Sequence, residues 1–174
     1  MAPKLVMGLS DMLRYMLYEC NQSLVPLSKE LKMLQDYIML EQVRYDDGLD
    51  IAAEFPEDAD EFYIAPLLLL PFVENCFKHG TSQVLEQPWI SLRIGITGRR
   101  FDMKLVNGKT DKAPQKKAAG IGISNARKRL EMLYPGRHEL RISNDADVFV
   151  VDLQLELERK QVVKEIKPGE LIYT

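Results

Sequence analysis

Cysteine is scarce in this sequence of 174 residues, and its scarcity excludes several kinds of protein. The two cysteines, Cys20 and Cys76, lie in apolar segments with helical spacing, and no CxxC motif is present. A disulfide framework and a structural zinc site are therefore not indicated. We expect a reduced, cytoplasmic protein.

Long hydrophobic runs and a surplus of basic charge are also absent. The longest nearly apolar run, residues 62–73, contains two prolines and is too short to cross a bilayer. No signal peptide precedes the first predicted helix, so we expect no membrane contact by these residues. Lys and Arg total 23 against 26 for Asp and Glu, which argues against a general nucleic-acid-binding protein. The length and the 46% hydrophobic content are sufficient for a buried core.

Two amphipathic helices are predicted at the start of the chain, at residues 4–19 and 27–45. The second helix also carries a polar stripe formed by Glu30, Tyr37, Glu41 and Arg44. Two interpretations of this stripe remain open. It is either a solvated face with ion pairs or a docking face for signalling.

Strands outnumber helices in the rest of the chain. The patterns predict strands at 49–55, 89–97, 100–107, 138–143 and 147–158, and helices at 65–79 and 122–134. This order predicts an α/β (α+β) fold, a two-layer sandwich with a mixed β-sheet and helices on one face. We expect a helical region at 1–47, a second domain at 48–158 and a charged tail at 159–174.

The segment PFVENCFKHG, residues 71–80, carries polar groups on an otherwise buried helix. Glu74, Asn75, Lys78 and His79 share one side of its last turns. An ion pair and the helix dipole account for Lys78 and His79. They do not account for Asn75, which is a poor helix former but offers an amide oxygen suited to Mg²⁺.

A second motif is AAGIGISNARKRL, residues 118–130. Gly120 and Gly122 at a helix N-terminus let backbone N–H groups approach a phosphate, and a lysine-rich segment predicted as a mobile loop precedes them. A third is Asn107 with Gly108 at a strand end. Asn107 either reads an adenine edge or belongs to an Asn-Gly turn.

The three motifs in this order resemble the Bergerat ATP-binding domain shared by sensor histidine kinases, gyrase and MutL. ENCFKHG resembles its N-box, VNG a departed form of its D-G motif, and GIGISN its G-box. The helices LSDMLRYMLYE and VPLSKELKMLQDYIMLEQVRY further resemble the LytS/YehU type of bacterial sensor histidine kinase. The resemblance covers about residues 5–157.

The resemblance implies ATP and Mg²⁺ as ligands. Asn75 would hold Mg²⁺, Lys78 would contact phosphate, and Asn107 would replace the aspartate that reads adenine. The remaining residues implied in ATP binding are His79, Gly80, Gly108, Gly120, Ile121, Gly122, Ser124, Asn125 and Arg129. Pro71 stands where ATP-hydrolysing relatives have a glutamate, so fast hydrolysis is not expected.

The resemblance also implies a role in a two-component system. The family's phosphoacceptor histidine lies before LSDMLRYML, and neither His79 nor His138 has that context. We therefore expect a fragment that binds ATP but lacks the acceptor, from a homodimeric parent protein anchored in the cytoplasmic membrane. Its partner would be a response regulator of the LytR type.

Two other functions remain open. A pseudokinase or protein-interaction module would keep the fold without productive nucleotide chemistry, and Asn107 favours it. A serine kinase of the anti-sigma type shares the fold but not the two N-terminal helices.

Overall fold

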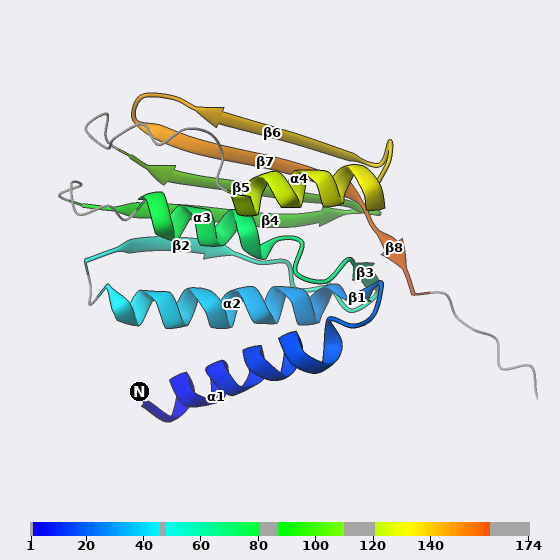
Figure 1. Ribbon diagram of the computed structural model, residues 1–174, viewed down its shortest axis with the longest axis horizontal. Coiled ribbons are helices and arrows are strands. Elements are labelled where there is room, and N and C mark those ends of the chain that lie inside the picture. Colours follow the sequence, from blue (N-terminus) through cyan, green and yellow to red (C-terminus); the bar gives the residue numbers. More distant parts are fainter. Residues whose placement is uncertain (1, 46–47, 81–86, 110–120, 161–174) are drawn as a thin grey trace, which may run out of the picture.

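The computed structural model describes residues 2–45, 48–80, 87–109 and 121–160 (Figure 1). The helices are α1 (Ala2–Arg14), the π-helical segment η1 (Tyr15–Glu19), α2 (Leu27–Arg44), α3 (Leu70–Gly80) and α4 (Ile121–Leu133). The strands are β1 (Val25–Pro26), β2 (Asp50–Glu54), β3 (Phe62–Ile64), β4 (Trp89–Thr97), β5 (Arg100–Gly108), β6 (His138–Asn144), β7 (Val148–Glu156) and β8 (Glu158–Arg159).

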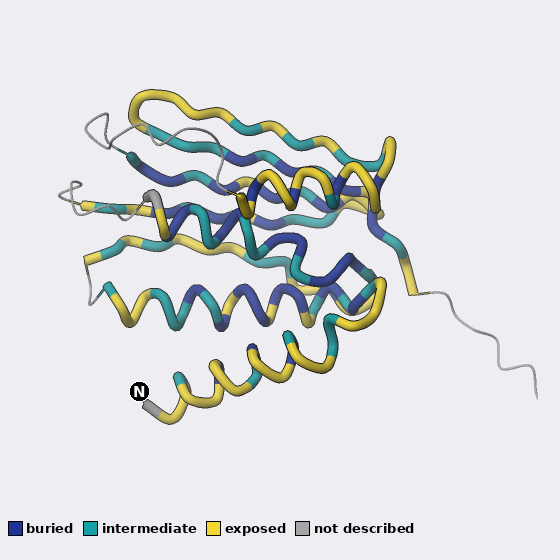
Figure 2. The backbone as a smooth tube through the Cα atoms, in the orientation of Figure 1, coloured by how far each residue is buried: buried dark blue, intermediate teal, exposed yellow. Residues whose placement is uncertain are grey.

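The two N-terminal helices form an antiparallel hairpin, as their apolar faces predict (Figure 1). α1 continues through η1, in which the Cys20 amide donates to the Tyr15 carbonyl at 3.2 Å. α2 is buried on the side that carries Leu27, Leu31 and Leu34. α1 remains largely exposed (Figure 2).

The main sheet has five strands in the order β2-β4-β5-β7-β6. β2 pairs with β4 in parallel, and the other neighbours are antiparallel, so the predicted mixed sheet is confirmed. β1, β3 and β8 form a separate small sheet beside it. Through β1 and β3, the connection between the hairpin helices is hydrogen-bonded to the segment that leads into α3.

α3 and α4 lie on one face of the main sheet, which confirms the predicted two-layer arrangement (Figure 1). Alternate residues of β5, namely Phe101, Met103 and Leu105, are buried in the core. Residues 102, 104 and 106 between them are less buried, as the two-residue period of a strand requires. One hydrophobic core joins residues of α2, such as Leu34, to residues of the sheet and of α3. The domain boundary near Gly48 therefore stays a prediction.

The start of the third helix differs from the prediction. The helix expected at 65–79 begins at Leu70, and residues 62–64 before it form β3, a strand that was not predicted. Leu67 has a φ of 54°, which is incompatible with a right-handed helix. The apolar run FYIAPLLLL could not reveal this turn, because buried strands and buried helices have similar composition.

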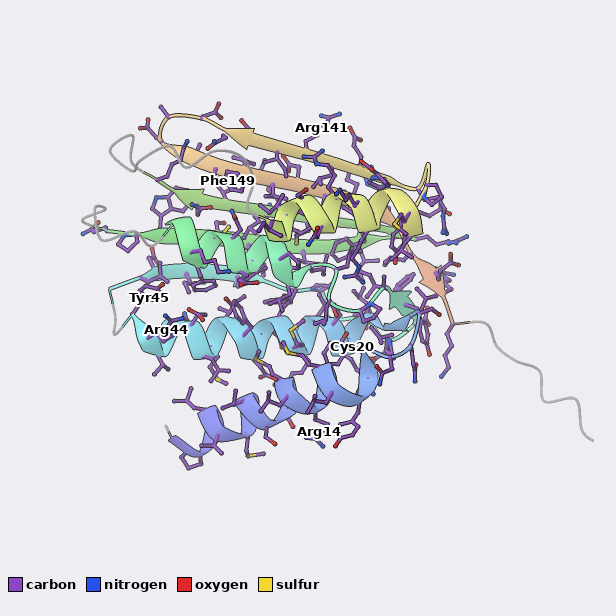
Figure 3. All side chains as sticks on the ribbon, viewed as in Figure 1. Arg14, Cys20, Arg44, Tyr45, Arg141 and Phe149 are labelled. Carbon is purple, nitrogen blue, oxygen red and sulfur yellow. The ribbon has the colours of Figure 1, made fainter. Side chains whose placement is uncertain are left out.

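The two cysteines are free thiols, as the sequence predicts. Cys20 is half-buried at the end of η1, where Figure 3 labels it, and Cys76 is buried in α3. Across the described ranges, we find no helix long and apolar enough to span a bilayer. Of the predicted charged tail, Arg159 pairs with β3 through β8, and residues 161–174 lie outside the described part.

Candidate functional site

Asn75 lies in the middle of α3, where an asparagine lowers helix stability. Its neighbours Cys76 and Phe77 are buried, whereas Asn75 itself is half-buried. Within the described part of the chain, no hydrogen bond to its side chain is found. The amide is therefore available to an outside ligand.

Lys78 and Glu74 form an ion pair of 2.5 Å between Nζ and Oε1 on the exposed side of α3. The Lys78 side chain is 64% exposed, so this pair contributes little to stability. It gives Lys78 a partner in the absence of ligand. His79 and Gly80 belong to α3, but their side-chain environment lies outside the described residues.

Asn107 is buried at the end of β5, on the same strand face as Leu105. It is 1% exposed, and its Nδ2 donates to the Gly108 carbonyl at 3.0 Å. Its Oδ1 has no hydrogen-bond partner among the described residues. A buried acceptor without a partner costs about 1–3 kcal/mol, so Asn107 is suited to a ligand that donates a hydrogen bond.

The Asn-Gly turn considered for residues 107 and 108 is wrong. Both residues lie in β5, and Gly108 pairs with Val148 of β7. A Cβ atom at Gly108 would lie 2.7 Å from Nε1 of Trp89, so only glycine allows this approach. Trp89, the single tryptophan of the chain, therefore lies directly beside the candidate site.

The first turn of α4 contacts the first turn of α3. A Cβ atom at Gly122 would lie 3.7 Å from the Cβ of Pro71, an ordinary van der Waals distance. Ile121, Gly122, Ser124 and Asn125 are exposed, while Ile123 is buried. The N–H groups of the first turn of a helix have no partner within the helix, so this turn favours an anion. Gly120, predicted to take part, lies outside the described residues.

Arg129 was predicted to contact ATP, and in the structure its guanidinium binds two backbone carbonyls. Nη1 donates to the Leu67 carbonyl at 3.0 Å, and Nη2 donates to the Pro66 carbonyl at 2.7 Å. Tyr134 at the end of α4 accepts from the Ala65 amide at 2.9 Å. α4 is thus tied to the turn before α3.

Glu30 is the buried group that the sequence analysis missed. It is 0% exposed, and its carboxylate accepts from the amides of Leu67, Leu68 and Leu69. Burial raises the pKa of Glu30, and these hydrogen bonds oppose that effect. The signal was its position three residues after Leu27 and four before Leu34, which places it on the buried side of α2.

The other members of the predicted polar stripe are arranged differently. Glu41 and Arg44 form an ion pair at 3.0 Å, with the Arg44 side chain exposed, as the solvated-face interpretation predicts (Figure 3). Tyr37 contacts the Phe77 ring of α3 edge-on, with centroids 5.7 Å apart. Neither interpretation of the stripe described Glu30, which is enclosed within the fold.

The side chains offer little to a metal on their own. Among the described residues, no group of three or more His, Cys, Asp or Glu side chains converges. Mg²⁺ commonly takes one or two protein oxygens and completes its shell with phosphate and water. The amide oxygen of Asn75 fits that limited role.

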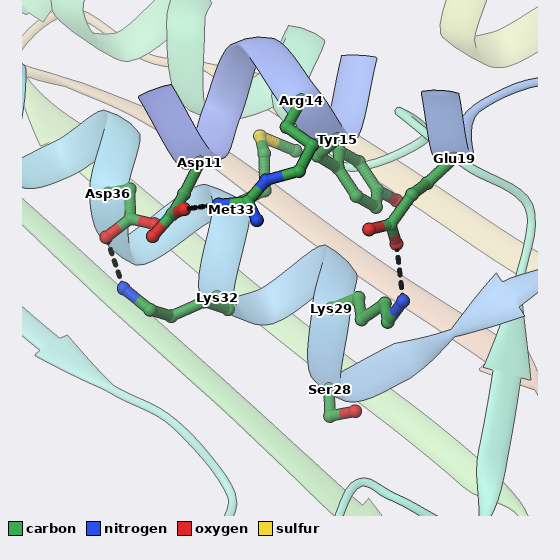
Figure 4. A pocket seen from close by; sticks show the side chains of 9 residues that line it. All are labelled: Asp11, Arg14, Tyr15, Glu19, Ser28, Lys29, Lys32, Met33 and Asp36. Atoms are coloured by element: carbon green, nitrogen blue, oxygen red, sulfur yellow. Dashed lines mark hydrogen bonds and ion pairs between the residues drawn. The ribbon is translucent and has the colours of Figure 1, made fainter. Parts of the chain in front are cut away.

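A pocket of about 250 Å³ between α1 and α2 is a separate feature (Figure 4). Its charged side chains pair with one another: Lys29 with Glu19 at 2.7 Å, and Lys32 with Asp36 at 2.5 Å. Tyr15 lines it and donates to Glu30. With its charges paired, this pocket shows no signal for a ligand.

Comparison with known structures identifies the architecture. The catalytic domain of histidine kinase ThkA matches with a TM-score of 0.54 at 14% identity, covering 79% of this chain and 97% of that one. The histidine kinase domain of the Erythrobacter litoralis EL346 blue-light activated kinase matches with a TM-score of 0.56 at 13% identity, covering 89% and 78%. The fold is that of a histidine kinase catalytic domain.

Sequence comparisons agree with this fold. A family model described as histidine kinase matches residues 1–49, which cover the hairpin. Sensor protein kinase HptS of Staphylococcus aureus (strain USA300) is 29% identical over 127 residues, or 73% of this chain. The chain spans 22% of the length of that relative. The structural comparison and the sequence comparison thus both relate this chain to histidine kinases.

Proposed function

We propose that this chain is the ATP-binding catalytic part of a two-component sensor histidine kinase, of the LytS/YehU type. The observation that carries the proposal is the buried Oδ1 of Asn107, which has no hydrogen-bond partner in the described part of this histidine kinase fold. The half-buried amide of Asn75 and the exposed first turn of α4 support it. Together they supply an acceptor for a base, a metal ligand and an anion site.

Each part of the candidate site has a distinct role in binding ATP. Asn107 Oδ1 accepts a hydrogen bond from the adenine amino group, because that oxygen has no partner among the described residues. The first turn of α4, with Gly122 and Ser124, faces the phosphates. Lys78 exchanges its contact with Glu74 for one with phosphate. Arg129 acts behind the site, through the turn before α3.

Asn75 is the residue that would hold Mg²⁺. When bound, Mg²⁺ neutralises charge on the transferred phosphoryl group. The protein contributes positioning and electrostatic stabilisation rather than covalent chemistry. Pro71, at the start of α3, offers no general base, so ATP hydrolysis is slow and the phosphoryl group reaches a histidine instead.

The receiving histidine is neither of those in this chain. His138 is the first residue of β6, and its Nδ1 lies 2.7 Å from the Tyr134 carbonyl oxygen. His79 belongs to α3, within the proposed nucleotide site. In the whole protein, the phosphoryl group passes from a histidine to a response regulator of the LytR type. The whole protein is a membrane-anchored homodimer. Its dimer contact uses the exposed apolar residues Val6, Met7, Leu9, Leu13, Leu17 and Tyr18.

A second function, a pseudokinase that serves as an interaction module, is favoured by two contacts. Lys78 is paired with Glu74, and Arg129 is bound to backbone carbonyls, so two residues predicted to bind ATP already have partners within the protein. The two functions differ in whether ATP binds with Mg²⁺.

Calorimetric titration with ATP, with Mg²⁺ and with EDTA, tests the proposal. We expect one saturable site that requires Mg²⁺ and that Asn75→Ala weakens at least about tenfold, since the metal loses its protein ligand. Asn21→Ala, an exposed asparagine of the hairpin region, is the matched control and should bind normally. Absence of binding in the wild-type chain would contradict the kinase function and leave the interaction module.

A further inference from the structure

α2 contacts both the turn that precedes α3 and the second half of α3. At the start of α3, Glu30 accepts from the backbone of residues 67–69. Near the other end, Phe77 packs between two rings of α2 and its cap, with centroids 5.7 Å from Tyr37 and 6.4 Å from Tyr45. The hairpin helix therefore runs along the helix that carries Asn75 (Figure 3).

The Glu30 contact is a carboxylate held by consecutive backbone amides. Oε2 accepts from Leu67 at 3.0 Å and from the Tyr15 hydroxyl, and Oε1 accepts from Leu68 at 3.1 Å and Leu69 at 3.4 Å. Consecutive N–H groups around a left-handed residue form an anion-binding nest. Here the anion in the nest is the carboxylate of Glu30, which belongs to the hairpin and lies 37 positions before Leu67 in the sequence.

The same turn is held from the opposite side by α4. Arg129 binds the carbonyls of Pro66 and Leu67, and Tyr134 binds the amide of Ala65. Leu67 adopts a φ of 54°, a strained conformation for a non-glycine residue that persists only where surrounding contacts hold it. The turn is therefore a joint between α2, α3 and α4.

We propose that Glu30 is a positioning residue that couples the α1–α2 hairpin to the nucleotide site. By fixing residues 67–69, it sets where α3 begins, and so the position of Asn75 and the contact of Pro71 with Gly122. This inference rests on the proposed function. Coupling is reciprocal, so nucleotide binding tightens the joint as much as the joint favours nucleotide binding.

The test compares Glu30→Gln with a destabilising control in the main sheet. Gln keeps the shape but replaces one acceptor oxygen with a donor, so either the Leu67 amide or the amides of Leu68 and Leu69 lose their partner. Ile142→Ala, in the edge strand β6 that pairs with β7, is expected to lower stability, and the denaturant midpoints of both variants are measured before their affinities are compared. Tyr15→Phe removes a single hydrogen bond and replaces Glu30→Gln if that variant does not fold.

Two readouts separate positioning from simple stabilisation. One is ATP affinity with Mg²⁺ by calorimetry. The other is the rate at which a thiol reagent labels Cys76 in a Cys20→Ser background without nucleotide, since Cys76 is buried in α3 beside Asn75. For Glu30→Gln we expect at least about fivefold weaker affinity and at least about fivefold faster labelling. The Ile142→Ala control should keep the wild-type affinity.

The outcomes are distinct. If Glu30→Gln binds ATP as wild type does, or if Ile142→Ala loses as much affinity, Glu30 has no positioning role. If the wild-type chain binds no ATP, the proposed function fails, and Cys76 labelling still decides whether Glu30 fixes α3. Labelling unchanged between wild type and Glu30→Gln overturns the inference in that case.

Discussion

Two buried polar residues, Glu30 and Asn107, show what a residue's neighbours add to its type. Glu30 accepts several hydrogen bonds within the fold, whereas Oδ1 of Asn107 has no partner in the described ranges. Satisfied buried groups stabilise a fold, and unsatisfied ones indicate a ligand. The sequence placed Asn107 in the candidate site but left Glu30 in a polar stripe. The spacing of Glu30 from Leu27 and Leu34 indicated its burial, but the amides that it binds are distant in sequence and leave no periodic signal.

Asn107→Asp tests whether position 107 is buried without a positive partner. Oδ1 of Asn107 finds no donor among the described residues, so a carboxylate there should make the variant less stable than wild type at pH 8 by about 1–3 kcal/mol. Burial would raise the pKa of the new carboxyl group, so acidification should reduce the deficit.

Urea unfolding of both proteins at pH 8 and pH 5 measures this difference. Asp102→Asn, at a partly exposed position of the same strand, serves as the control. A deficit of equal size at the two pH values would show that position 107 does not exclude water.

Cys76 gives a pH-dependent prediction in the native protein. Burial raises its pKa from 9.0 to about 12, so at pH 9 the folded protein holds almost no thiolate there. Iodoacetamide should label half-buried Cys20 first and Cys76 only through opening of α3. Mass spectrometry of the labelled peptides measures the order.

The raised pKa of Cys76 also makes the stability of the fold depend on pH in one direction. The folded pKa of Cys76 is raised, so its contribution is full below pH 9 and is lost as pH rises toward 12. Cys76→Ala should flatten this part of the alkaline stability profile. Rapid labelling of native Cys76 at pH 9 would contradict its burial.

At the scale of elements, local patterns predicted most helices and strands. α1 with η1, α2, β4, β5 and α4 agree with the predicted bounds to within about two residues, because each has a clear apolar period. The start of α3 could not be predicted in this way. It is set by Glu30 and Arg129, which come from two other helices, rather than by residues 65–69 themselves.

Arg129→Lys tests the tie between α4 and the turn before α3. A lysine cannot donate from two nitrogens to the carbonyls of Pro66 and Leu67, so we expect a loss of about 1–3 kcal/mol in the free energy of unfolding. Arg127→Lys, an exposed neighbour on the same helix, should change it by less than about 0.5 kcal/mol. Equal effects in chemical denaturation would mean that the two carbonyl contacts do not stabilise the fold.

At the scale of the whole molecule, the order of elements was enough to predict the fold class. Hairpin-spaced strands and amphipathic helices predicted a mixed sheet covered on one face. The order did not predict that β2 pairs in parallel with β4, or that β1 and β3 bind the hairpin to the segment before α3. Those pairings join residues distant in sequence, whose partners depend on the packed core.

The candidate site, like the fold, was predicted in part from the sequence and depends in part on contacts that form only in the folded chain. The sequence identified Asn75, Asn107 and Gly122 by residue type and motif order, and the structure places them on α3, β5 and α4 of one helix-covered sheet. It could not show that Lys78 and Arg129 have partners within the protein. These contacts form only in the folded chain, and a phosphate that binds Lys78 would have to displace Glu74.

The most direct measurement of the central claim is an NMR titration of the ¹⁵N-labelled 20.0 kDa chain with ATP and Mg²⁺. We predict saturable shifts for the amides of Asn75, Asn107, Gly108, Gly122 and Ser124, with the indole signal of Trp89 responding because it lies beside Gly108. The amides of β6 should change little. Shifts confined to the α1–α2 pocket, or no shifts at saturating ATP, would contradict a nucleotide site formed by α3, β5 and α4.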